Sequence, residues 1–175
     1  GKFDWENLVK RISSQDSRTE IYKKDISTPK HYAYIKISEG CNRFCAFCAI
    51  PLITGRHTSI PMEQLLDEVK DLVAKGVKEF NVIAQDLSSS GLDLYGKMML
   101  PELIDKMAQV VGVEWIRLHY AYPAQFPYEV LPVMAKHKNV CKYLDIALQH
   151  VSDKVLNNMR RHINKEETFA LIERI

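Results

Sequence analysis

The stretch Gly40-Cys41-Asn42-Arg43-Phe44-Cys45-Ala46-Phe47-Cys48 carries three of the chain's four cysteines, at spacings of four and three residues. On a helix with a rise of about 1.5 Å per residue, Cys41 and Cys48 would lie about 10 Å apart. That is too far to share one ion at metal–sulfur distances of about 2.3 Å. If all three thiols are metal ligands, the segment must be a loop that wraps around its metal. Gly40 gives the backbone the freedom to enter such a turn.

Spacing alone leaves three interpretations of this loop open. Three cysteines on a four-iron cluster would leave one iron free for a substrate. With His57 as a fourth ligand, the same cysteines would form a closed Cys₃His zinc site. They could also be buried structural thiols. Their crowding, with no evident set of disulfide partners, is typical of metal or redox chemistry in a reducing compartment.

The segments on both sides of the loop predict a strand before it and a helix after it. Residues 31–37 are rich in aromatic and β-branched side chains, which favours a strand. After the loop, Pro61 suits a first helical position and Gly76 ends the helix. The apolar face between them comprises Leu65, Leu66, Val69, Leu72 and Val73. The cysteine loop thus directly follows a strand, at the face where (β/α) barrels keep their active sites.

The same alternation of strand and helix continues to the end of the sequence. The expected segments are a strand over 80–84, a helix over 101–111, strands over 113–118 and 143–148, and between them a helix over 127–137 that Pro132 kinks or delays. Two helices close the chain, the second opened by the capping-box pair Asn164 and Glu167. With no hairpin signal, this pattern predicts an α/β fold with a parallel sheet in sequential strand order.

Four such units are about half of a (β/α) barrel, which typically needs about 250 residues. The predicted fold is therefore a partial, open TIM-like barrel with parallel strands. We expect residues 1–30, which are polar, to be a leader and linker, and residues 31–175 to be the N-terminal part of the barrel domain. The last helix reaches Ile175 without a capping signal, so we expect the barrel to be truncated.

Composition excludes several other classes of protein. The hydrophobic fraction is 46% and the charged fraction 26%, as in a soluble globular protein. The net charge is +2 and the basic residues are scattered, which argues against a dedicated nucleic-acid surface. No apolar run approaches the roughly 20 residues of a membrane span, and no signal peptide opens the chain. We expect a cytoplasmic protein with no membrane partner.

Polar pairs follow three consecutive predicted strands: Gln85-Asp86, His119-Tyr120 and Gln149-His150. A polar residue at a strand end is usually loop chemistry, but parallel strands deliver their C-terminal ends to one edge of the sheet. We therefore expect these residues to converge on the face that carries the cysteine loop. Since neighbours on a strand point to opposite sides, only one member of each pair can face the barrel interior.

Two further residues have plain structural explanations. Arg117 lies inside a strand, where an unpaired charge is costly, and a salt bridge to an acid such as Asp145 is the simplest explanation. Ligand binding is the alternative. Cys141 precedes a strand, at the end opposite the cysteine loop, and we expect it to be buried and inert.

The run Cys-x₃-Cys-x-Phe-Cys after a first strand resembles the signature of radical S-adenosylmethionine (SAM) enzymes. More widely, Ile37–Asn42, Phe47–Pro51 and Gly55-Arg56 resemble the methylthiotransferase family. Within that family, Ala84-Gln85-Asp86, Ile116–Pro123 and Leu144–His150 are similar to the branch that modifies an aspartate of a small-subunit ribosomal protein. The tRNA-modifying branch usually has Gln-Asn where this chain has Gln85-Asp86. The resemblance runs from about His31 to Ile175.

The resemblance implies a cofactor and a set of residues that bind it. Cys41, Cys45 and Cys48 would hold a 4Fe-4S cluster, with SAM on its open iron. Gln85 would hold the amino-acid part of SAM, Phe47 would pack beside its adenine, and Gln149 would face the same interior. No residue is expected to be catalytic in its own right. In the family, an electron from the cluster cleaves SAM to a radical that takes a hydrogen from the aspartate β-carbon.

The resemblance also implies what this chain lacks. The family has an N-terminal domain with an auxiliary 4Fe-4S cluster that supplies the methylthio group, a small C-terminal β-barrel and a Gly-rich strand that helps hold SAM. We therefore expect the transferase activity in a longer parent enzyme and an inactive isolated fragment, with a ribosomal protein and an electron donor as partners. The alternatives are a tRNA adenosine methylthiotransferase core, which would bind nucleic acid, and a zinc-stabilised module without catalysis.

Overall fold

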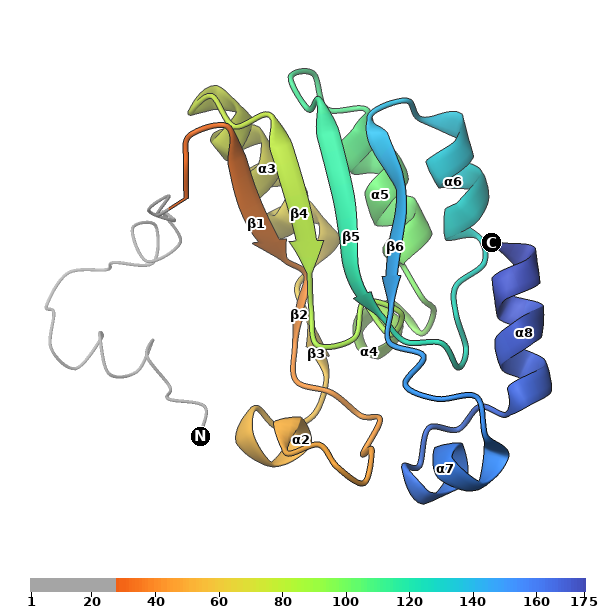
Figure 1. Cartoon of the computed structure of the whole chain (residues 1–175). Coiled ribbons are helices and arrows are strands. Elements are labelled where there is room, and N and C mark those ends of the chain that lie inside the picture. Colours follow the sequence, from red (N-terminus) through yellow and green to blue (C-terminus); the bar gives the residue numbers. More distant parts are fainter. Residues whose placement is uncertain (1–27) are drawn as a thin grey trace, which may run out of the picture.

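The computed structural model describes residues 28–175, and most of the expected leader, residues 1–30, lies outside this range. A four-stranded sheet forms its centre, in the order β1-β4-β5-β6 (Figure 1). The strands are β1 (Tyr32–Lys36), β4 (Glu79–Ile83), β5 (Trp115–Ala121) and β6 (Val140–Ile146). Every neighbouring pair is parallel. This confirms the predicted sequential order and the open, partial TIM-like barrel.

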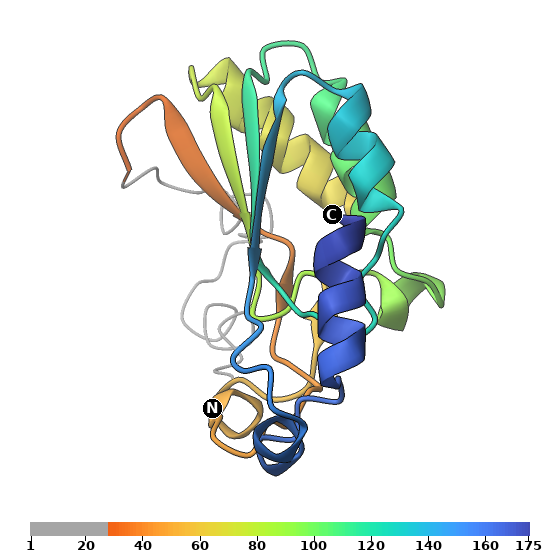
Figure 2. The ribbon, with the colours of Figure 1, turned by 45° about the vertical axis from the view of Figure 1, so that its right-hand side comes forward.

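Helices cover one face of this sheet. Three long crossover helices pack on it, α3 (Met62–Ala74), α5 (Leu100–Ala108) and α6 (Val130–Lys136), and α8 (Lys165–Arg174) stands beyond β6. Short helices α2 (Ile50–Ile53), α4 (Leu92–Tyr95) and α7 (Asp153–Asn158) gather near the carboxyl ends of the strands (Figure 1). Turned by 45°, the sheet shows no helix on its opposite face among residues 28–175 (Figure 2). In a closed barrel that bare face would be the interior.

The core lies between the sheet and its helices, and strand alternation explains it. Inward positions of neighbouring strands, such as Ile35, Val82 and Ile116, are fully buried. Their neighbours on each strand point to the bare face. In α3 the buried residues recur at helical spacing, as the sequence predicts. Pro61 is the N-cap of α3, one position before the place predicted for it.

Proline and capping chemistry set two further helix starts. Helix α6 begins at Val130, later than predicted, so Pro132 falls in its first turn, where its missing N–H costs nothing. At α8 the predicted capping box is present: the Glu167 N–H donates to Asn164 Oδ1 over 2.8 Å, and the Asn164 N–H donates to Glu167 Oε2 over 2.9 Å.

One expectation needs correction, and one element was not predicted. Arg117 does pair with an acid, but the partner is Glu79 on the neighbouring strand β4, at 2.8 Å, and not Asp145. Parallel register places Arg117 near Glu79, whereas Asp145 lies 3.9 Å from His119 Nδ1. The sequence also gave no sign of a two-stranded antiparallel ribbon, β2 (Ser38–Glu39) with β3 (Thr58–Ser59), which is too short for a periodic signal.

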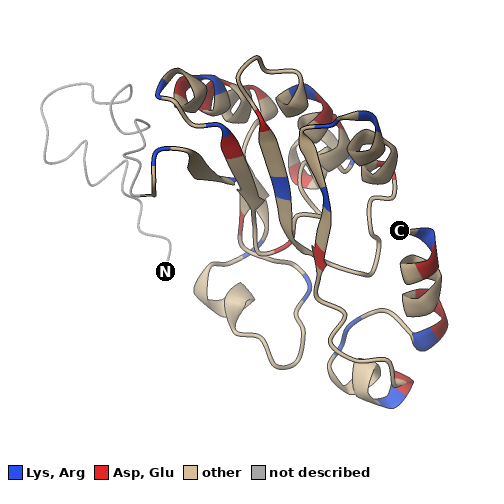
Figure 3. Ribbon diagram, turned by 45° about the horizontal axis from the view of Figure 1, so that its top comes forward, with Lys and Arg blue, Asp and Glu red and all other residues tan. Residues whose placement is uncertain are grey.

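Charged side chains are spread over the helices and strands without segregation. Lys and Arg alternate with Asp and Glu along the elements in Figure 3. Exposed side chains of opposite charge pair with one another, as Lys70 does with Asp67 one helical turn away. Within residues 28–175, no helix combines the length and apolarity that crossing a bilayer requires.

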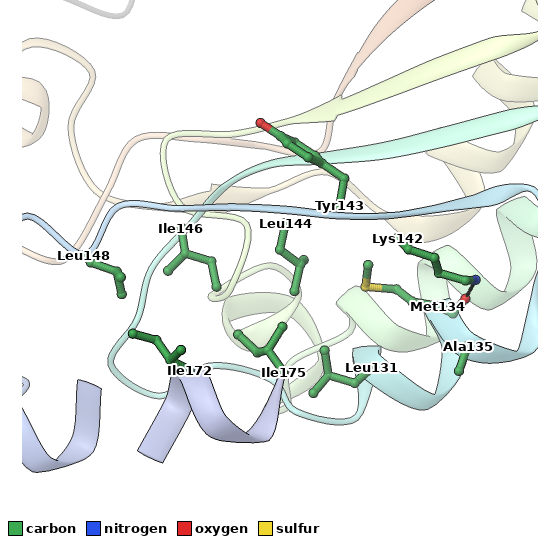
Figure 4. Close-up of a pocket in the computed structure, with 10 residues that line it drawn as sticks. All are labelled: Leu131, Met134, Ala135, Lys142, Tyr143, Leu144, Ile146, Leu148, Ile172 and Ile175. Atoms are coloured by element: carbon green, nitrogen blue, oxygen red, sulfur yellow. Dashed lines mark hydrogen bonds between the residues drawn. The ribbon is translucent and has the colours of Figure 1, made fainter. Parts of the chain in front are cut away.

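A cavity of about 520 Å³ lies along the free edge of β6, beside α6 and α8. Leu144 and Ile146 of β6 face Ile172 of α8 and Ile175, which follows α8, across it (Figure 4). The Tyr143 hydroxyl points to the other side of the strand (Figure 4). The walls are almost entirely aliphatic, so this cavity offers neither a metal ligand nor an acid–base pair.

Candidate functional site

A second cavity, of about 500 Å³, opens at the carboxyl ends of the parallel strands. The cysteine loop forms one side, and residues at or after the ends of β4, β5 and β6 form the other. Its polar, thiol and aromatic lining residues are Lys36, Cys41, Arg43, Cys45, Phe47, Cys48, Gln85, Tyr120, Tyr122, Gln149 and Arg161. Parallel strands all end at the same edge of the sheet, so the residues that follow them lie close together there.

The cysteine segment is a loop, as predicted. Between β2 and α2 the backbone forms no helix or strand. A turn closed by Cys48 N–H to Cys45 carbonyl (3.0 Å) and a bond from Ala46 N–H to the Met159 carbonyl (3.0 Å) hold its second half. All three thiols are free; Cys41 and Cys45 are buried and Cys48 is half-buried. The loop therefore presents to one cavity three sulfurs that form no disulfide.

Gly40 allows the loop to begin where it does. Its φ is +74°, and a Cβ at this position would lie 2.3 Å from the Arg56 carbonyl oxygen. The close approach brings two ends of the loop together, and the Cys41 N–H donates to the Gly55 carbonyl at 3.2 Å. Both the left-handed conformation and the backbone contact exclude a side chain.

We expect Gly40→Ala to destabilise the fold by about 2–4 kcal/mol, because left-handed strain and a backbone clash add together. Gly55→Ala is the matched control: its φ is +79°, but nothing lies within 4 Å of the added Cβ. The control should cost only the conformational penalty of about 1–2 kcal/mol. Urea unfolding of the two variants measures the difference, and equal losses would contradict the role of the close approach.

Arg43 connects the cysteine loop to the loop after β4. Its guanidinium donates to Asp86 (2.7 Å), Ser89 (3.2 Å) and Gln125 (3.1 Å), and the Arg43 backbone N–H donates to Cys41 Sγ at 3.4 Å. Burial raises the pKa of the Cys41 thiol, and this N–H only partly offsets that effect. Without a cation, Cys41 therefore favours its neutral form.

Tyr122 lies between two guanidinium groups. Arg43 and Arg161 each place their central carbon 4.2 Å from the ring centroid, a distance at which both cannot share one face. The Tyr122 hydroxyl donates to the Arg161 carbonyl at 2.6 Å and lies 3.8 Å from Cys45 Sγ. Burial raises the pKa of this phenol well above its usual value, so it stays protonated.

The structure brings together all the residues that the sequence singled out for the cofactor. Gln85, Gln149 and Phe47 line the same cavity as the three cysteines. Gln85 Nε2 is 3.4 Å from Glu39 Oε1, and its Oε1 is buried without a hydrogen-bond partner among residues 28–175. Asp86 turns away and is almost fully buried. The geometry thus agrees with the inward placement predicted for Gln85 and Gln149.

Two other residues named from the sequence lie elsewhere. His119 is not part of the cavity lining; its Nε2 is 3.2 Å from Asn81 Oδ1 on the bare face of the sheet. It sits inside β5, which runs to Ala121, three residues beyond the predicted end. Cys141 is buried near the start of β6, at the opposite end of the sheet.

His57 does not join the cysteines as a fourth ligand. It lines a separate cavity with Asp93, and its Nε2 lies 3.2 Å from Ser59 Oγ. Burial lowers the pKa of His57, so the ring is neutral at pH 7. The alternative Cys₃His zinc arrangement is therefore not formed among residues 28–175, where no three such side chains are set to hold one ion. A four-iron cluster needs no such convergence, because each cysteine binds a different iron.

Asp93 joins α4 to β3 through Ser59, whose N–H and hydroxyl both donate to its carboxylate. Burial alone would raise the pKa of Asp93, but these bonds lower it below 3.8. A carboxyl whose pKa is lower in the folded state stabilises the protein above its unfolded pKa and loses that effect as the pH falls through the folded value.

We therefore expect the free energy of unfolding to fall below about pH 3.8 in part through Asp93. Asp93→Asn should lower stability at pH 7 and flatten this part of the profile. Urea unfolding between about pH 2 and pH 7, a range that spans the usual carboxyl pKa values, measures both effects. An unchanged slope in the variant would contradict the assignment.

Sequence reasoning missed Arg43, Tyr122 and Arg161 as parts of the site. Arg161 follows Arg160 in a polar stretch that reads as a solvated surface. Only the fold shows that Arg160 is exposed and Arg161 is buried. The position of Tyr122, four residues after the buried Leu118, gave no periodic signal that its ring would separate two arginines.

The donor set fits an iron–sulfur cluster with a polar ligand. Three thiols share one cavity, which suits iron. Two buried polar atoms, Gln85 Oε1 and Arg161 Nε, have no hydrogen-bond partner among residues 28–175. Both belong to residues that line the same cavity. Buried polar atoms normally have hydrogen-bond partners, and a group bound in this cavity would supply them for these two atoms.

Comparison with known proteins identifies the family to which the sequence is similar. A sequence model of the radical SAM superfamily matches residues 35–175. Proteins named ribosomal protein uS12 methylthiotransferase RimO are 59% identical over 174 residues in Phocaeicola vulgatus, 58% over 173 in Bacteroides fragilis and 57% over 175 in Porphyromonas gingivalis. Each match covers 99% or more of this chain but 40% of the relative, so the chain spans two fifths of those proteins.

A solved structure shares the fold at low identity. The radical S-adenosylmethionine methyltransferase TsrM from Kitasatospora setae, with tryptophan and a SAM analogue bound, superposes with a TM-score of 0.67 at 16% identity. The match covers 88% of this chain and 32% of TsrM. At this identity the likeness establishes the arrangement of strands and helices only.

Proposed function

The chain belongs to the radical SAM superfamily, and from this premise we propose that it is the core of an enzyme that adds a methylthio group to an aspartate β-carbon of ribosomal protein uS12. The observation that carries the proposal is the gathering of Cys41, Cys45 and Cys48 at one cavity at the carboxyl ends of the parallel strands. The likeness to proteins named as uS12 methylthiotransferases supports the substrate.

Different residues of the cavity would bind different parts of the cofactors. The three thiols would bind a 4Fe-4S cluster, which with SAM supplies the radical that removes a hydrogen atom from the target carbon. Gln85, through its unpartnered Oε1, would accept a hydrogen bond from the amino group of SAM. Phe47, half-exposed on the loop, would pack beside the adenine, and Gln149 would contact the ligand from β6.

The protein's own contribution is positioning and the exclusion of water. Ile83, Ala84 and Ala121, at the ends of β4 and β5, give the cavity an apolar wall. The Arg43–Asp86 pair joins the cysteine loop to the segment after β4, and the protonated Tyr122 hydroxyl donates to the Arg161 carbonyl. A reactive radical survives only where competing hydrogen donors and bulk water are kept away.

The proposal extends to the domain organisation and the cell. Residues 31–175 would be the N-terminal part of the barrel domain, and residues 1–30 would lead into it. An auxiliary 4Fe-4S cluster, bound outside this chain, would supply the methylthio group. The enzyme would act in the cytoplasm, where ribosomal proteins and a low-potential electron donor are available.

The test uses a protein of the relatives' full length that carries this chain. It is reduced anaerobically with SAM and offered uS12 and, separately, tRNA. Mass spectrometry should find the added methylthio group on one aspartate of uS12 and none on tRNA. Modified adenosine with unmodified uS12 would assign the tRNA reaction instead. Modification of neither, by a preparation loaded with iron, would overturn the proposal.

A further inference from the structure

Arg161 is a buried cation with no carboxylate partner. Arg161 is 3% exposed, and its guanidinium forms no ion pair with an acidic side chain of residues 28–175. A buried charge normally has a counter-charge, because leaving water is costly. The chain nonetheless turns this arginine inward, so its counter-charge must come from another kind of group.

The guanidinium points at the cysteine loop. Its Nη1 donates to Cys45 Sγ over 3.2 Å, and Nη2 donates to the Ala147 carbonyl. The face of the group lies on the Tyr122 ring, and the Tyr122 hydroxyl donates to the Arg161 carbonyl. The guanidinium is thus held by contacts on several sides, and its Nη1 faces the Cys45 sulfur.

The backbone around Arg161 is strained to hold it there. Arg160 and His162 both have φ of +54°, a left-handed conformation that is unfavourable for residues with a side chain. The Arg161 N–H donates to the Leu156 carbonyl at 3.0 Å, which closes the turn after α7. The strain on both sides turns Arg161 into the protein, while Arg160 remains outside.

Arg43 provides an internal contrast. It stacks on the same Tyr122 ring at the same distance, but Asp86 neutralises it at 2.7 Å. Its contact with the cysteines is made by its backbone N–H, whereas Arg161 uses its charged group. Of these two arginines, only Arg161 has no carboxylate partner among residues 28–175 and directs its guanidinium at a cysteine sulfur, where it can stabilise a negative charge.

We propose that Arg161 is a positioning residue that raises the reduction potential of the cluster through a charged N–H···S hydrogen bond to Cys45. The inference rests on the proposed function, because it needs the cluster. Reduction adds one electron from an external reductant and breaks no bond, so the cluster and its thiolates gain one negative charge. A buried guanidinium stabilises the more negative state, and hydrogen bonds to ligand sulfurs tune such potentials.

The test compares three variants of the anaerobically reconstituted chain, with the midpoint potential measured by a dithionite titration followed by electron paramagnetic resonance. Arg161→Gln should keep its iron and shift the midpoint to more negative values. Arg161→Lys, which keeps the charge, should shift it less. Arg160→Gln is the matched control: it removes the neighbouring, exposed arginine and should leave the midpoint unchanged.

A second measurement looks for the hydrogen bond itself and does not depend on Arg161→Gln. In the wild-type chain labelled with ¹⁵N in its arginine guanidinium groups, pulsed resonance of the reduced cluster should show a nitrogen coupling that Arg161→Lys weakens or removes. This decides the question if Arg161→Gln fails to hold iron. Absence of the coupling, or a midpoint in Arg161→Gln equal to that of wild type, would overturn the inference alone. A wild-type chain that takes up no iron would overturn it together with the proposed function.

Discussion

Cys45→Ser is expected to remove most of the iron that the chain takes up on anaerobic reconstitution. Cys45 is buried at the cavity and shares it with Cys41 and Cys48. A serine hydroxyl does not ionise near neutral pH and is a hard oxygen ligand, whereas iron–sulfur clusters select thiolates. Iron and sulfide analysis of the purified variant measures the loss.

Cys141→Ser is the matched control for this experiment. Cys141 is equally buried but lies near the start of β6, and a strand of seven residues separates its ends by about 20 Å. Its replacement should leave the iron content unchanged. Comparable losses in both variants would mean that the cluster is bound elsewhere or that the iron is adventitious.

Asp86→Ala is expected to destabilise the fold by about 3–5 kcal/mol, because it removes one partner of a buried ion pair. The Asp86 side chain is 1% exposed and that of Arg43 12%. Asp86 also accepts hydrogen bonds from the Ser88 N–H (2.9 Å) and the Ser89 hydroxyl (2.7 Å). The variant leaves one buried cation and two donors without their acceptor.

Asp67→Ala is the control, since it breaks an exposed pair with Lys70 at 3.1 Å, in which the Asp67 side chain is 75% exposed. Exposed pairs contribute about 0–1 kcal/mol, so this change should cost little. Urea unfolding of both variants gives the comparison. A cost for Asp86→Ala no larger than that of the control would show that the buried pair does not hold the loop.

The sequence was sufficient for the fold because its signals are local and repeated. Four apolar strands alternate with amphipathic helices, and parallel order follows from the lack of hairpin turns. The boundaries were less predictable. Strand β6 begins at Val140, three residues before the predicted start, because Val140 pairs with Ile116 across the sheet. Sequence patterns do not show such tertiary pairing.

The candidate site could be predicted only where ligands follow strands or form a motif. The three cysteines, Gln85 and Gln149 meet that condition, and the structure places them together. Arg161 lies between α7 and α8 and reaches the site through a strained turn. Its hydrogen-bond acceptor, the sulfur of Cys45, is 116 positions away in the sequence. No local sequence pattern predicts a contact between residues so far apart in the chain.

The most direct test of the central claim is the metal content of the wild-type chain after anaerobic reconstitution with iron, sulfide and zinc offered together. If the cysteine loop holds a radical SAM cluster, the chain should take up about four irons and four sulfides and little zinc. One zinc per chain, with no sulfide and no iron, would contradict the assignment and indicate a structural metal site instead.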